Sequence, residues 1–388
     1  MHKRDEKGRN LIKFLQGDVF DKIKELEDNS IDCVVTSPPY WGLRDYGVSG
    51  QLGLEPTYQE HIQNIVKLFK VIKPKLKDSA TVWLNYGDSY AATINGTKVK
   101  DIKNDDRKFV DKPFCTIQGS IKPKDLVMIP NRIAIALQDD GWWIRSEIIW
   151  HKPNPMPESV KDRPTNCHEK IWLITKNKKY YYDAEAVREP CQNETIKRMT
   201  LGNKGKIGNN KNSTGWKQLN NYWGSEQSVK DANKGRNRRN VWTITTKPFK
   251  DAHFATFPKD LIEPCIKAGC PEKVCVKCGK PQVKEFYRNK STLPVKRNKR
   301  DGDGDRAVGG VYQKWLEENP LQIKIKPSCD CNADFKSGVV LDPFAGAGTT
   351  GIVAAINNRN AVLIELNSEY IKLAEDRIEK ELGLFNDK

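Results

Sequence analysis

The chain has 388 residues, 37% of them hydrophobic and 9% aromatic, which is enough for one large α/β domain and a smaller one. No segment approaches the roughly 20 apolar residues that span a bilayer, and residues 1–7 lack the apolar run of a signal peptide, so we expect a cytoplasmic protein. A net charge of +16 argues against an acidic small molecule as the partner and favours nucleic acid.

The excess positive charge is concentrated in one segment. Between Cys191 and Asn240 there are eleven Lys or Arg residues against three Asp or Glu residues. The surrounding region is rich in Asn and Gly and has little apolar periodicity. It is either a basic linker or a loop-rich binding module. Its aromatic residues favour the module because linkers rarely carry them; they are Trp216, Tyr222 and Trp223.

Strands and helices are predicted to alternate through the first 90 residues. Short apolar runs at Leu11–Gln16 and Ile31–Thr36 predict strands, with a short helix at Phe20–Leu26 between them. Apolar residues at helical spacing from Tyr58 predict a longer helix, and "TVWLNYGDSY" after it predicts a third strand. This alternation is typical of βαβ units in a parallel sheet.

The next section begins with a polar stretch and returns to regular structure. Residues 93–124 are charged and poorly periodic, which predicts a long loop or insertion. A helix is expected at Asp125–Asp139, closed by Gly141. The sequences "WWIRSEIIWHK" and "EKIWLITKNKKYYYD" then predict two strands, read as an antiparallel pair.

The final section carries a glycine-rich turn between a strand and a helix. Val339–Leu341 predicts the strand, and the helix is expected at Thr349–Asn357. A second strand is expected at Ala361–Leu366, with another helix from Glu369. This is the pattern of a nucleotide-binding βαβ unit.

Small residues in this turn allow a ligand to approach the backbone closely. The turn runs Asp342-Pro-Phe344-Ala-Gly346-Ala-Gly348, and a helix starts immediately after it. Glu365 lies at the tip of the next strand, where such units place an acceptor for ribose hydroxyls. The spacing departs from Gly-x-Gly-x-x-Gly, so a nucleoside ligand is favoured over a nicotinamide dinucleotide.

A stiff loop follows the second predicted strand. Ser37-Pro38-Pro39-Tyr40 is expected to be non-helical and outside any ladder, because its prolines fix the chain and lack backbone donors. Free acceptors in a rigid loop at a strand end suit a binding or catalytic site. The alternative is that the loop simply ends the strand, with Tyr40 and Trp41 as core aromatic residues.

Two motifs resemble those of DNA amino-methyltransferases. "DPFAGAGTT" resembles the S-adenosylmethionine-binding motif Phe-x-Gly-x-Gly, and "TSPPYW" resembles the catalytic Ser/Asp/Asn-Pro-Pro-aromatic motif. The catalytic motif comes first, as in the beta class; "LQGD" is similar to the cofactor-adenine strand and "DAHFATFPKDLIEPCIKAG" to the methionine-binding motif. The resemblance implies an α/β fold with a doubly wound, mostly parallel sheet, the Rossmann-like methyltransferase fold in circularly permuted order.

The resemblance also implies the cofactor contacts. Glu365 would accept hydrogen bonds from the ribose, and Asp18 from the adenine amine. Ala255 and Thr256, at a helix start, would meet the methionine carboxylate. Many relatives carry a Pro-Thr-Gln-Lys-like sequence here, where this chain has Phe254-Ala255-Thr256-Phe257. The residues that would line the methionine and sugar pocket are Asp342, Phe344, Gly346, Gly348 and Thr349.

The catalytic motif implies a way to activate a poor nucleophile. The lone pair of a base's exocyclic amine is delocalised into the ring, and the Ser37 hydroxyl and Pro38 carbonyl can accept hydrogen bonds that favour a pyramidal nitrogen. That nitrogen can attack the sulfonium methyl group in line, without a covalent enzyme intermediate. The base has to be flipped out of the duplex, where Tyr40 would stack on it and Trp41 would extend the same wall.

The target base follows from the first residue of the motif. In the family, serine there is associated more often with N4 of cytosine and aspartate with N6 of adenine. We expect a sequence-specific DNA methyltransferase acting on N4 of cytosine, with N6 of adenine as the alternative. An RNA or protein-amide methyltransferase is a more distant alternative, because in those relatives the glycine motif usually comes first. A third class, a non-catalytic DNA-binding regulator, conflicts with the intact Ser37, Pro38, Tyr40 and Gly348.

Four cysteines form two close pairs, Cys275-Val-Lys-Cys278 and Cys329-Asp-Cys331. Paired thiolates suit tetrahedral zinc, and reduced cysteines without metal are the alternative. Removing Val274–Lys336 would leave a short connection of the kind the family has here. We therefore expect a zinc-ribbon-like insertion, and its Lys and Arg residues suggest contact with DNA phosphates.

The expected organisation has five parts. The catalytic half of the methyltransferase domain covers 1–182, and the target-recognition region covers 183–241. The methionine-binding segment is 242–273, the zinc-ribbon-like insertion 274–336 and the cofactor-binding half 337–388.

The expected partner is double-stranded DNA rather than a membrane. Arg236, Arg238 and Arg239 are candidate readers of base edges and phosphates, and DNA binding would associate the protein with the nucleoid. Analogy with beta-class relatives suggests a homodimer. A cognate restriction endonuclease is expected where such an enzyme is restriction-linked rather than solitary or phage-borne.

Overall fold

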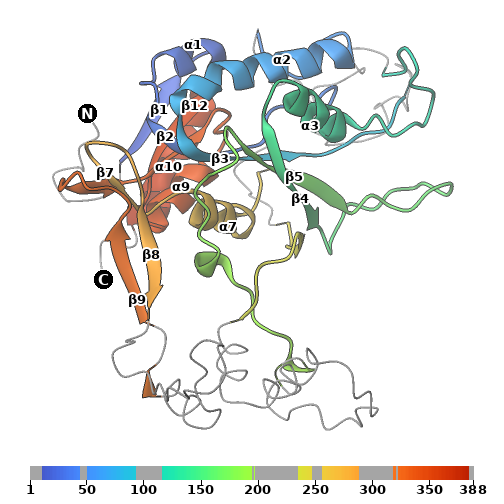
Figure 1. Cartoon of the computed structure of the whole chain (residues 1–388). Helices are drawn as coiled ribbons and strands as arrows, with labels where there is room; N and C mark the ends of the chain where they lie inside the picture. The colour runs from blue at the N-terminus through green and yellow to red at the C-terminus, as the bar shows by residue number, and fades with distance from the viewer. Residues whose placement is uncertain are drawn as a thin grey trace, which may run out of the picture. The chain divides into compact units, whose positions relative to one another are not determined.

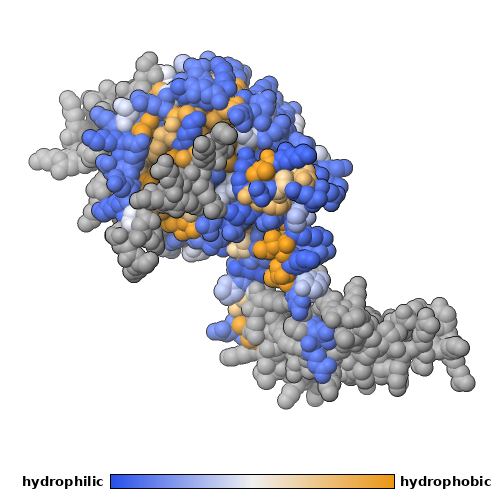
Figure 2. Space-filling view, turned by 90° about the vertical axis from the view of Figure 1, so that its left-hand side faces the viewer, coloured by the Kyte–Doolittle hydropathy of each residue, from blue (hydrophilic) through white to orange (hydrophobic). Residues whose placement is uncertain are grey.

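The computed structural model describes residues 11–43, 50–92, 116–194, 196, 235–246, 256–287, 318–319 and 322–383. The chain forms two compact units: Met1–Asp183, Arg239–Pro281 and Cys331–Lys388 make the first, and Ala184–Arg238 and Gln282–Asp330 make the second. Among the described helices, none is long and apolar enough to cross a membrane. Figure 2 shows mainly hydrophilic residues on the visible coloured surface, interrupted by smaller hydrophobic patches.

An eight-stranded sheet forms the centre of the first unit, in the order β1-β12-β11-β2-β3-β5-β4-β6 (Figure 1). Parallel pairing joins β1, β12, β11, β2 and β3, whereas β5 is antiparallel to both β3 and β4. The predicted mostly parallel sheet and its antiparallel pair are therefore confirmed. The strands are β1 Ile12–Gln16, β2 Ile31–Thr36, β3 Leu76–Tyr86, β4 Trp143–His151, β5 His168–Thr175, β6 Val241–Thr243, β11 Val339–Asp342 and β12 Asn360–Glu365.

Helices cover both faces of this sheet. Figure 1 shows α1, α2 and α3 on one side of the strands and α7, α9 and α10 on the other. Every residue of β2 is buried, as expected for a central strand between two helical layers. The doubly wound arrangement is confirmed. The helices are α1 Val19–Lys24, α2 Tyr58–Ile72, α3 Ile129–Asp139, α7 Lys259–Gly269, α9 Thr349–Ile356 and α10 Ser368–Gly383.

Two small antiparallel ribbons accompany the main sheet. In the first unit, β7 (Lys273–Cys275) pairs with β10 (Phe335–Ser337). In the second unit, β8 (Gln282–Tyr287) pairs with β9 (Gln322–Pro327). Most of the basic region at Cys191–Asn240, and most of the predicted loop at 93–124, lies outside the described residues.

The start of α3 differs from the predicted helix. The helix was expected from Asp125 but begins at Ile129. Met128 has a left-handed backbone with φ of 62°, and the Ile129 N–H donates to Asp88 Oδ1 at 3.2 Å. A side chain distant in sequence therefore satisfies a donor of the first turn, which local spacing does not reveal. The strand predicted at residues 169–183 was also too long, because β5 ends at Thr175, and β3 runs from Leu76 to Tyr86 rather than over residues 81–90. The short strand β6 was not predicted. The other predicted helices and strands agree with the structure to within two residues at their ends.

A buried ion pair joins three neighbouring strands at the amino edge of the sheet. Asp32 of β2 contacts Lys77 Nζ of β3 at 2.7 and 2.8 Å, and it accepts the Val339 N–H of β11 at 2.9 Å. Burial raises the pKa of the Asp32 carboxyl, although Lys77 opposes that rise. The pair helps to set the register of the strands whose opposite ends carry the predicted motifs.

We predict that Lys77→Met destabilises the fold by roughly 3–5 kcal/mol, because it leaves Asp32 buried without its cation. The loss should shrink at acidic pH, where Asp32 can be neutral. Denaturant unfolding at several pH values measures both effects. Lys75→Met is the matched control: Lys75 pairs with the exposed Asp28 at 2.7 Å, and a surface pair of this kind contributes about 0–1 kcal/mol. Equal losses in the two variants would contradict the prediction.

Candidate active site

The carboxyl edge of the central sheet carries both predicted motifs. β2 and β11 are parallel neighbours, with Cys33 opposite Val340. Their carboxyl ends therefore lie at one edge, where ligands bind in open parallel sheets. The loops that follow them are Ser37–Tyr40 and Asp342–Gly348, so the sheet brings together motifs that are far apart in sequence.

Asp342 organises the glycine turn from within. It is 1% exposed; Oδ2 accepts the Thr350 hydroxyl at 2.5 Å and Oδ1 accepts the Phe344 N–H at 3.1 Å. Burial raises the pKa of Asp342 to about 6, against the opposing effect of these hydrogen bonds. Both oxygens are thus used to hold the turn against the start of α9, and contact between Asp342 and a cofactor stays a prediction.

Two glycines in this turn adopt left-handed conformations for different reasons. A Cβ on Gly348 (φ 70°) would lie 3.0 Å from Ala374 Cβ, so α10 packs against the turn too closely for a side chain. A Cβ on Gly346 (φ 49°) would meet no atom of the described residues within 4 Å, so within the described structure there is open space above the backbone. The Thr349 hydroxyl accepts a hydrogen bond from Arg377 at 2.8 Å. Space for a ligand therefore lies at Gly346 rather than at Gly348.

Glu365 ends β12 beside this open space. Its carboxylate oxygens accept the N–H groups of Gly346 at 2.9 Å and Asn367 at 3.0 Å. Burial raises the pKa of Glu365, while these bonds lower it, and each oxygen keeps lone-pair capacity for a hydroxyl donor. On the adjacent β1, Asp18 follows the strand and caps α1 by accepting the Phe20 N–H at 2.9 Å. Glu365 and Asp18 thus occupy neighbouring strand ends, and their contacts with a cofactor stay predictions.

The predicted methionine-carboxylate contact is described only in part. Ala255 lies outside the described residues. Thr256 lies just before α7, whose N-cap is Pro258, and among the described residues no side chain caps the helix. The uncapped N–H groups of this helix start are suited to an anion. The roles of Ala255 and Thr256 stay predictions.

The loop Ser37–Tyr40, predicted to be catalytic, is held by an aromatic residue from β3. The Tyr40 ring stacks on Tyr86, with 4.4 Å between ring centroids and 27° between planes. The Tyr86 hydroxyl accepts the Trp41 N–H at 2.8 Å and lies 3.4 Å from the Pro39 carbonyl. Tyr86 is 1% exposed, so its position is fixed by the core. The stiffness expected from the two prolines is thus reinforced by a buried side chain.

A polar network beside the loop was missed by the sequence analysis. The Tyr40 hydroxyl donates to Glu169 Oε2 at 2.8 Å and accepts from Asn85 Nδ2 at 3.0 Å. Asn85 also donates to Glu169 at 2.9 Å, and the second Glu169 oxygen pairs with Lys152. The only sequence signal for this network was Asn85, a polar residue near the end of an apolar strand. Glu169 reaches Asn85 because β5 pairs with β3, and Lys152 reaches Glu169 because it directly follows β4, which pairs with β5.

Hydrogen-bonding capacity sets the direction of this network. The Glu169 carboxylate only accepts, so the Tyr40 hydroxyl is its donor. Burial raises the pKa of Tyr40 well above its usual value, and the Glu169 charge adds to the rise, so the phenol keeps its proton. Because the Tyr40 proton is used by Glu169, the Ser37 hydroxyl is the donor in its 3.2 Å hydrogen bond to the Tyr40 oxygen. The Ser37 lone pairs are left available for another donor.

Comparison with known proteins identifies the chain. The model of the DNA methylase family matches residues 31–277 and 330–376. The Type II methyltransferase M.Cfr9I of Citrobacter freundii is 37% identical over 98% of this chain and 92% of its own. M.SmaI of Serratia marcescens, also a Type II methyltransferase, is 36% identical over 94% of this chain and 90% of its own. The chain belongs to the DNA methylase family.

A solved structure agrees with this assignment at the level of fold. The cytosine-N4-specific PvuII DNA methyltransferase aligns with 97% of this chain and 94% of its own, at a TM-score of 0.50 and 15% identity. The family resemblance of "TSPPYW" and "DPFAGAGTT" is confirmed, and the protein is a DNA methyltransferase of the Type II family.

Trp41 of this DNA methylase lies in the core. It is 2% exposed, and its indole N–H donates to the Glu55 carbonyl at 2.9 Å. Its ring meets Tyr58 edge-on at 6.2 Å. This burial favours the alternative reading of Trp41 as a core aromatic residue over a wall that contacts DNA.

The three candidate DNA-reading arginines have different surroundings. Arg236 pairs with Glu189, with Nε 3.1 Å from Oε1, and the two residues also form a backbone bridge. Arg239 is exposed and its carbonyl accepts the Trp242 indole N–H at 2.7 Å. Arg238 is half-buried. Arg236 thus has a structural partner in the DNA methylase, and DNA contact by all three stays a prediction.

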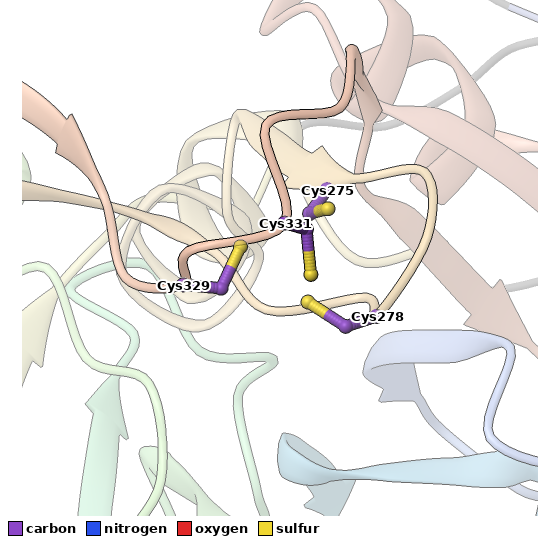
Figure 3. A group of neighbouring side chains, drawn as sticks. All are labelled: Cys275, Cys278, Cys329 and Cys331. Carbon is purple, nitrogen blue, oxygen red and sulfur yellow. The ribbon is translucent and has the colours of Figure 1, made fainter.

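The two cysteine pairs converge. The Sγ atoms of Cys275, Cys278, Cys329 and Cys331 all lie within 4.8 Å of one another (Figure 3). None of the described cysteines forms a disulfide. The residues that sequence spacing selected as metal ligands therefore form one cluster.

We predict that Asp342→Asn changes the pH dependence of stability. A carboxyl whose pKa is raised in the folded state stabilises the fold below its ordinary pKa of 3.8, and this contribution is lost as the pH rises through about 6. As the pH rises from 4 to 8, the free energy of unfolding of the variant should therefore increase by up to about 3 kcal/mol relative to that of the native chain. Denaturant unfolding of both proteins across that range measures the difference. A difference that does not vary with pH would contradict the assigned pKa.

Proposed function

We propose that this DNA methyltransferase transfers the methyl group of S-adenosylmethionine to N4 of a flipped-out cytosine in double-stranded DNA. The observation that carries the proposal is the Ser37 hydroxyl, directed by Tyr40 so that its lone pairs remain available, on a loop beside the glycine turn. Serine at the first motif position favours cytosine over adenine in the resemblance given above. Methylation at N6 of adenine is the alternative outcome.

The glycine turn fits the proposed cofactor. Gly346 leaves open space over its backbone, and the Glu365 oxygens retain capacity for two ribose hydroxyls. Phe344 is half-buried at the same turn, and Asp18 stands at the adjacent strand end for the adenine amine. S-adenosylmethionine supplies an electrophilic methyl group on a sulfonium. The helix start near Thr256 would hold its carboxylate.

The chain's own groups position the amine. Ser37 Oγ and the Pro38 carbonyl accept hydrogen bonds from the two amine protons, which draws the nitrogen lone pair out of the ring's conjugation. Pro38 and Pro39 keep these acceptors fixed, so little reorganisation is needed when the base arrives. The Tyr40 ring, held from one side by Tyr86, offers a surface for the flipped base.

Glu169 acts as a positioning residue through Tyr40. Its charge, balanced by Lys152, keeps the Tyr40 proton directed to the carboxylate. The Tyr40 oxygen is then an acceptor for Ser37, and the Ser37 oxygen becomes a better acceptor because hydrogen bonds in a chain polarise one another. Glu169 would thereby strengthen the hydrogen bond between Ser37 and the reacting amine without contacting the base.

The surrounding charge is suited to DNA. The net charge of +16 supplies long-range attraction to phosphates, and the basic segment at Cys191–Asn240 would provide target recognition. Arg238 and Arg239 lie in the described part of that segment. As a member of the Type II group, the enzyme would protect a site cut by a cognate restriction endonuclease, and it would act as a homodimer in the cytoplasm, at the nucleoid.

We predict N4-methylcytosine in DNA treated with the purified enzyme and S-adenosylmethionine. Mass spectrometry of the released nucleosides measures the product. Ser37→Ala should lower the methylation rate on the order of a hundredfold, because it removes one preorganised acceptor at the reacting group. Ser146→Ala, on β4, is the matched control and should retain the native rate. N6-methyladenine would overturn the assigned base, and methyl transfer only to RNA or protein would overturn the substrate class.

We predict that Tyr40→Phe and Glu169→Gln each lower kcat roughly tenfold, the equivalent of about 1.4 kcal/mol, with KM for S-adenosylmethionine unchanged. Because Glu169 acts on Ser37 only through the hydrogen bond of Tyr40, the double variant should be no slower than Tyr40→Phe alone. Tyr180→Phe, which loses only a 3.3 Å contact from Arg145, is the matched control. Additive losses in the double variant would exclude the proposed relay.

A further inference from the structure

We propose that Cys275, Cys278, Cys329 and Cys331 bind one structural Zn²⁺ ion. All four Sγ atoms lie within 4.8 Å of one another, and Figure 3 shows the side chains directed toward a common region. In a tetrahedral zinc-thiolate site with Zn–S bonds of about 2.3 Å, the sulfurs are about 3.8 Å apart. The cluster therefore has the size of such a site, and only a small adjustment of the side chains would complete it.

A tight turn places the first pair. Cys275 ends β7, and its carbonyl accepts the Gly279 N–H at 2.9 Å, while its own N–H donates to the Lys280 carbonyl at 2.9 Å. Gly279 has a left-handed φ of 71°, which lets the chain reverse directly after Cys278. The two thiols are thus brought together by backbone geometry rather than by chance contact.

Pairing of two short strands positions the second pair. Cys275 lies opposite Phe335 in the ribbon of β7 and β10, and the Val276 N–H donates to the Asp334 carbonyl at 2.9 Å. Asn332 has a left-handed φ of 46°, so the chain turns again directly after Cys331. Each cysteine pair is therefore followed by a turn with a left-handed residue, and the two turns bring their thiols together.

The alternatives explain the arrangement less well. Two disulfides would require the sulfurs to associate in pairs at about 2 Å, whereas the structure forms none among the described cysteines and groups all four. Thiols without metal would gain little from mutual proximity, and Cys278 is exposed to oxidation. A cation shared by four thiolates accounts for both the spacing and the convergence.

The ribbon of β8 and β9 gives the metal a structural purpose. Ile323 is 57% exposed, Ile325 is 61% exposed and Tyr287 is 42% exposed, so the described ribbon buries little apolar surface. An isolated two-stranded ribbon is only marginally stable in water. Cys278 precedes β8 and Cys329 follows β9, so zinc would join the two chain ends of the ribbon and stabilise a segment whose described residues bury little apolar surface.

Metal analysis of the full-length protein, purified under reducing conditions without chelators, tests the site. We expect about one zinc per chain. Replacement by Co²⁺ should give the thiolate charge-transfer and visible bands of tetrahedral cobalt. Absence of any bound metal, or mass spectrometry that finds two disulfides in freshly prepared protein, would overturn the proposal.

Variants separate metal binding from folding. Cys278→Ser and Cys331→Ser should each lose the zinc and make the ribbon of β8 and β9 more sensitive to limited proteolysis, with the same change produced by a chelator in the native protein. Cys167→Ser, outside the cluster, is the matched control and should keep both zinc and protection. Retention of native zinc content by Cys278→Ser and Cys331→Ser would contradict the assigned ligands even if either variant were less stable.

Discussion

The parallel pairing of β2 with β11 is the constraint on which the site depends. Their carboxyl ends carry the catalytic loop and the glycine turn, so the two motifs approach each other only if these strands are neighbours in the correct register. Asp32 contributes to that register from the opposite edge, because one carboxylate accepts the first N–H of β11 and pairs with Lys77 of β3. A buried charge at one edge of the sheet thereby helps to align the reactive loops at the other.

Rigidity of the catalytic loop comes from two sources with different origins. Pro38 and Pro39 restrict the backbone locally, whereas Tyr86 and the network of Asn85, Glu169 and Lys152 restrict the side chains from other strands. The local restriction limits the conformations of the loop, and the distant groups select the direction of its hydroxyl groups. In the proposed reaction, an acceptor fixed in this way would need no rearrangement when a base enters, which is the form of preorganisation that lowers a barrier.

The sequence predicted the elements of the sheet well because their signals are local. Apolar runs ending in Gly17-Asp18, Ser37-Pro38 and Asp342-Pro343 located three strand ends, and cysteine spacing selected the four thiols that converge. Glu169 was not predictable in the same way. It reaches Tyr40 through antiparallel pairing across β3 and β5, and nothing near position 169 in the chain records that partner.

Trp41 and α3 illustrate the same limit from the opposite direction. Beside the catalytic loop, a tryptophan is as compatible with DNA contact as with packing, and only the Glu55 carbonyl and the core around it decide for packing. The start of α3 likewise depends on Asp88, about 40 residues away in sequence, which accepts the Ile129 N–H. Tertiary partners, not local propensity, determine both outcomes.

The distribution of charge connects the fold with the proposed reaction. The protein is strongly basic overall, yet its carboxyl edge holds Asp342, Glu365 and Glu169. Burial raises the pKa values of Asp342 and Glu365, which means that each carboxylate lacks full solvation and gains from a donor or a cation. A sulfonium donor is attracted to such an edge, and the neutral thioether left after methyl transfer is attracted less. In the proposed reaction, the positive net charge would attract DNA phosphates while the carboxylates at this edge would repel them, so a neutral base could enter the site with its phosphates outside.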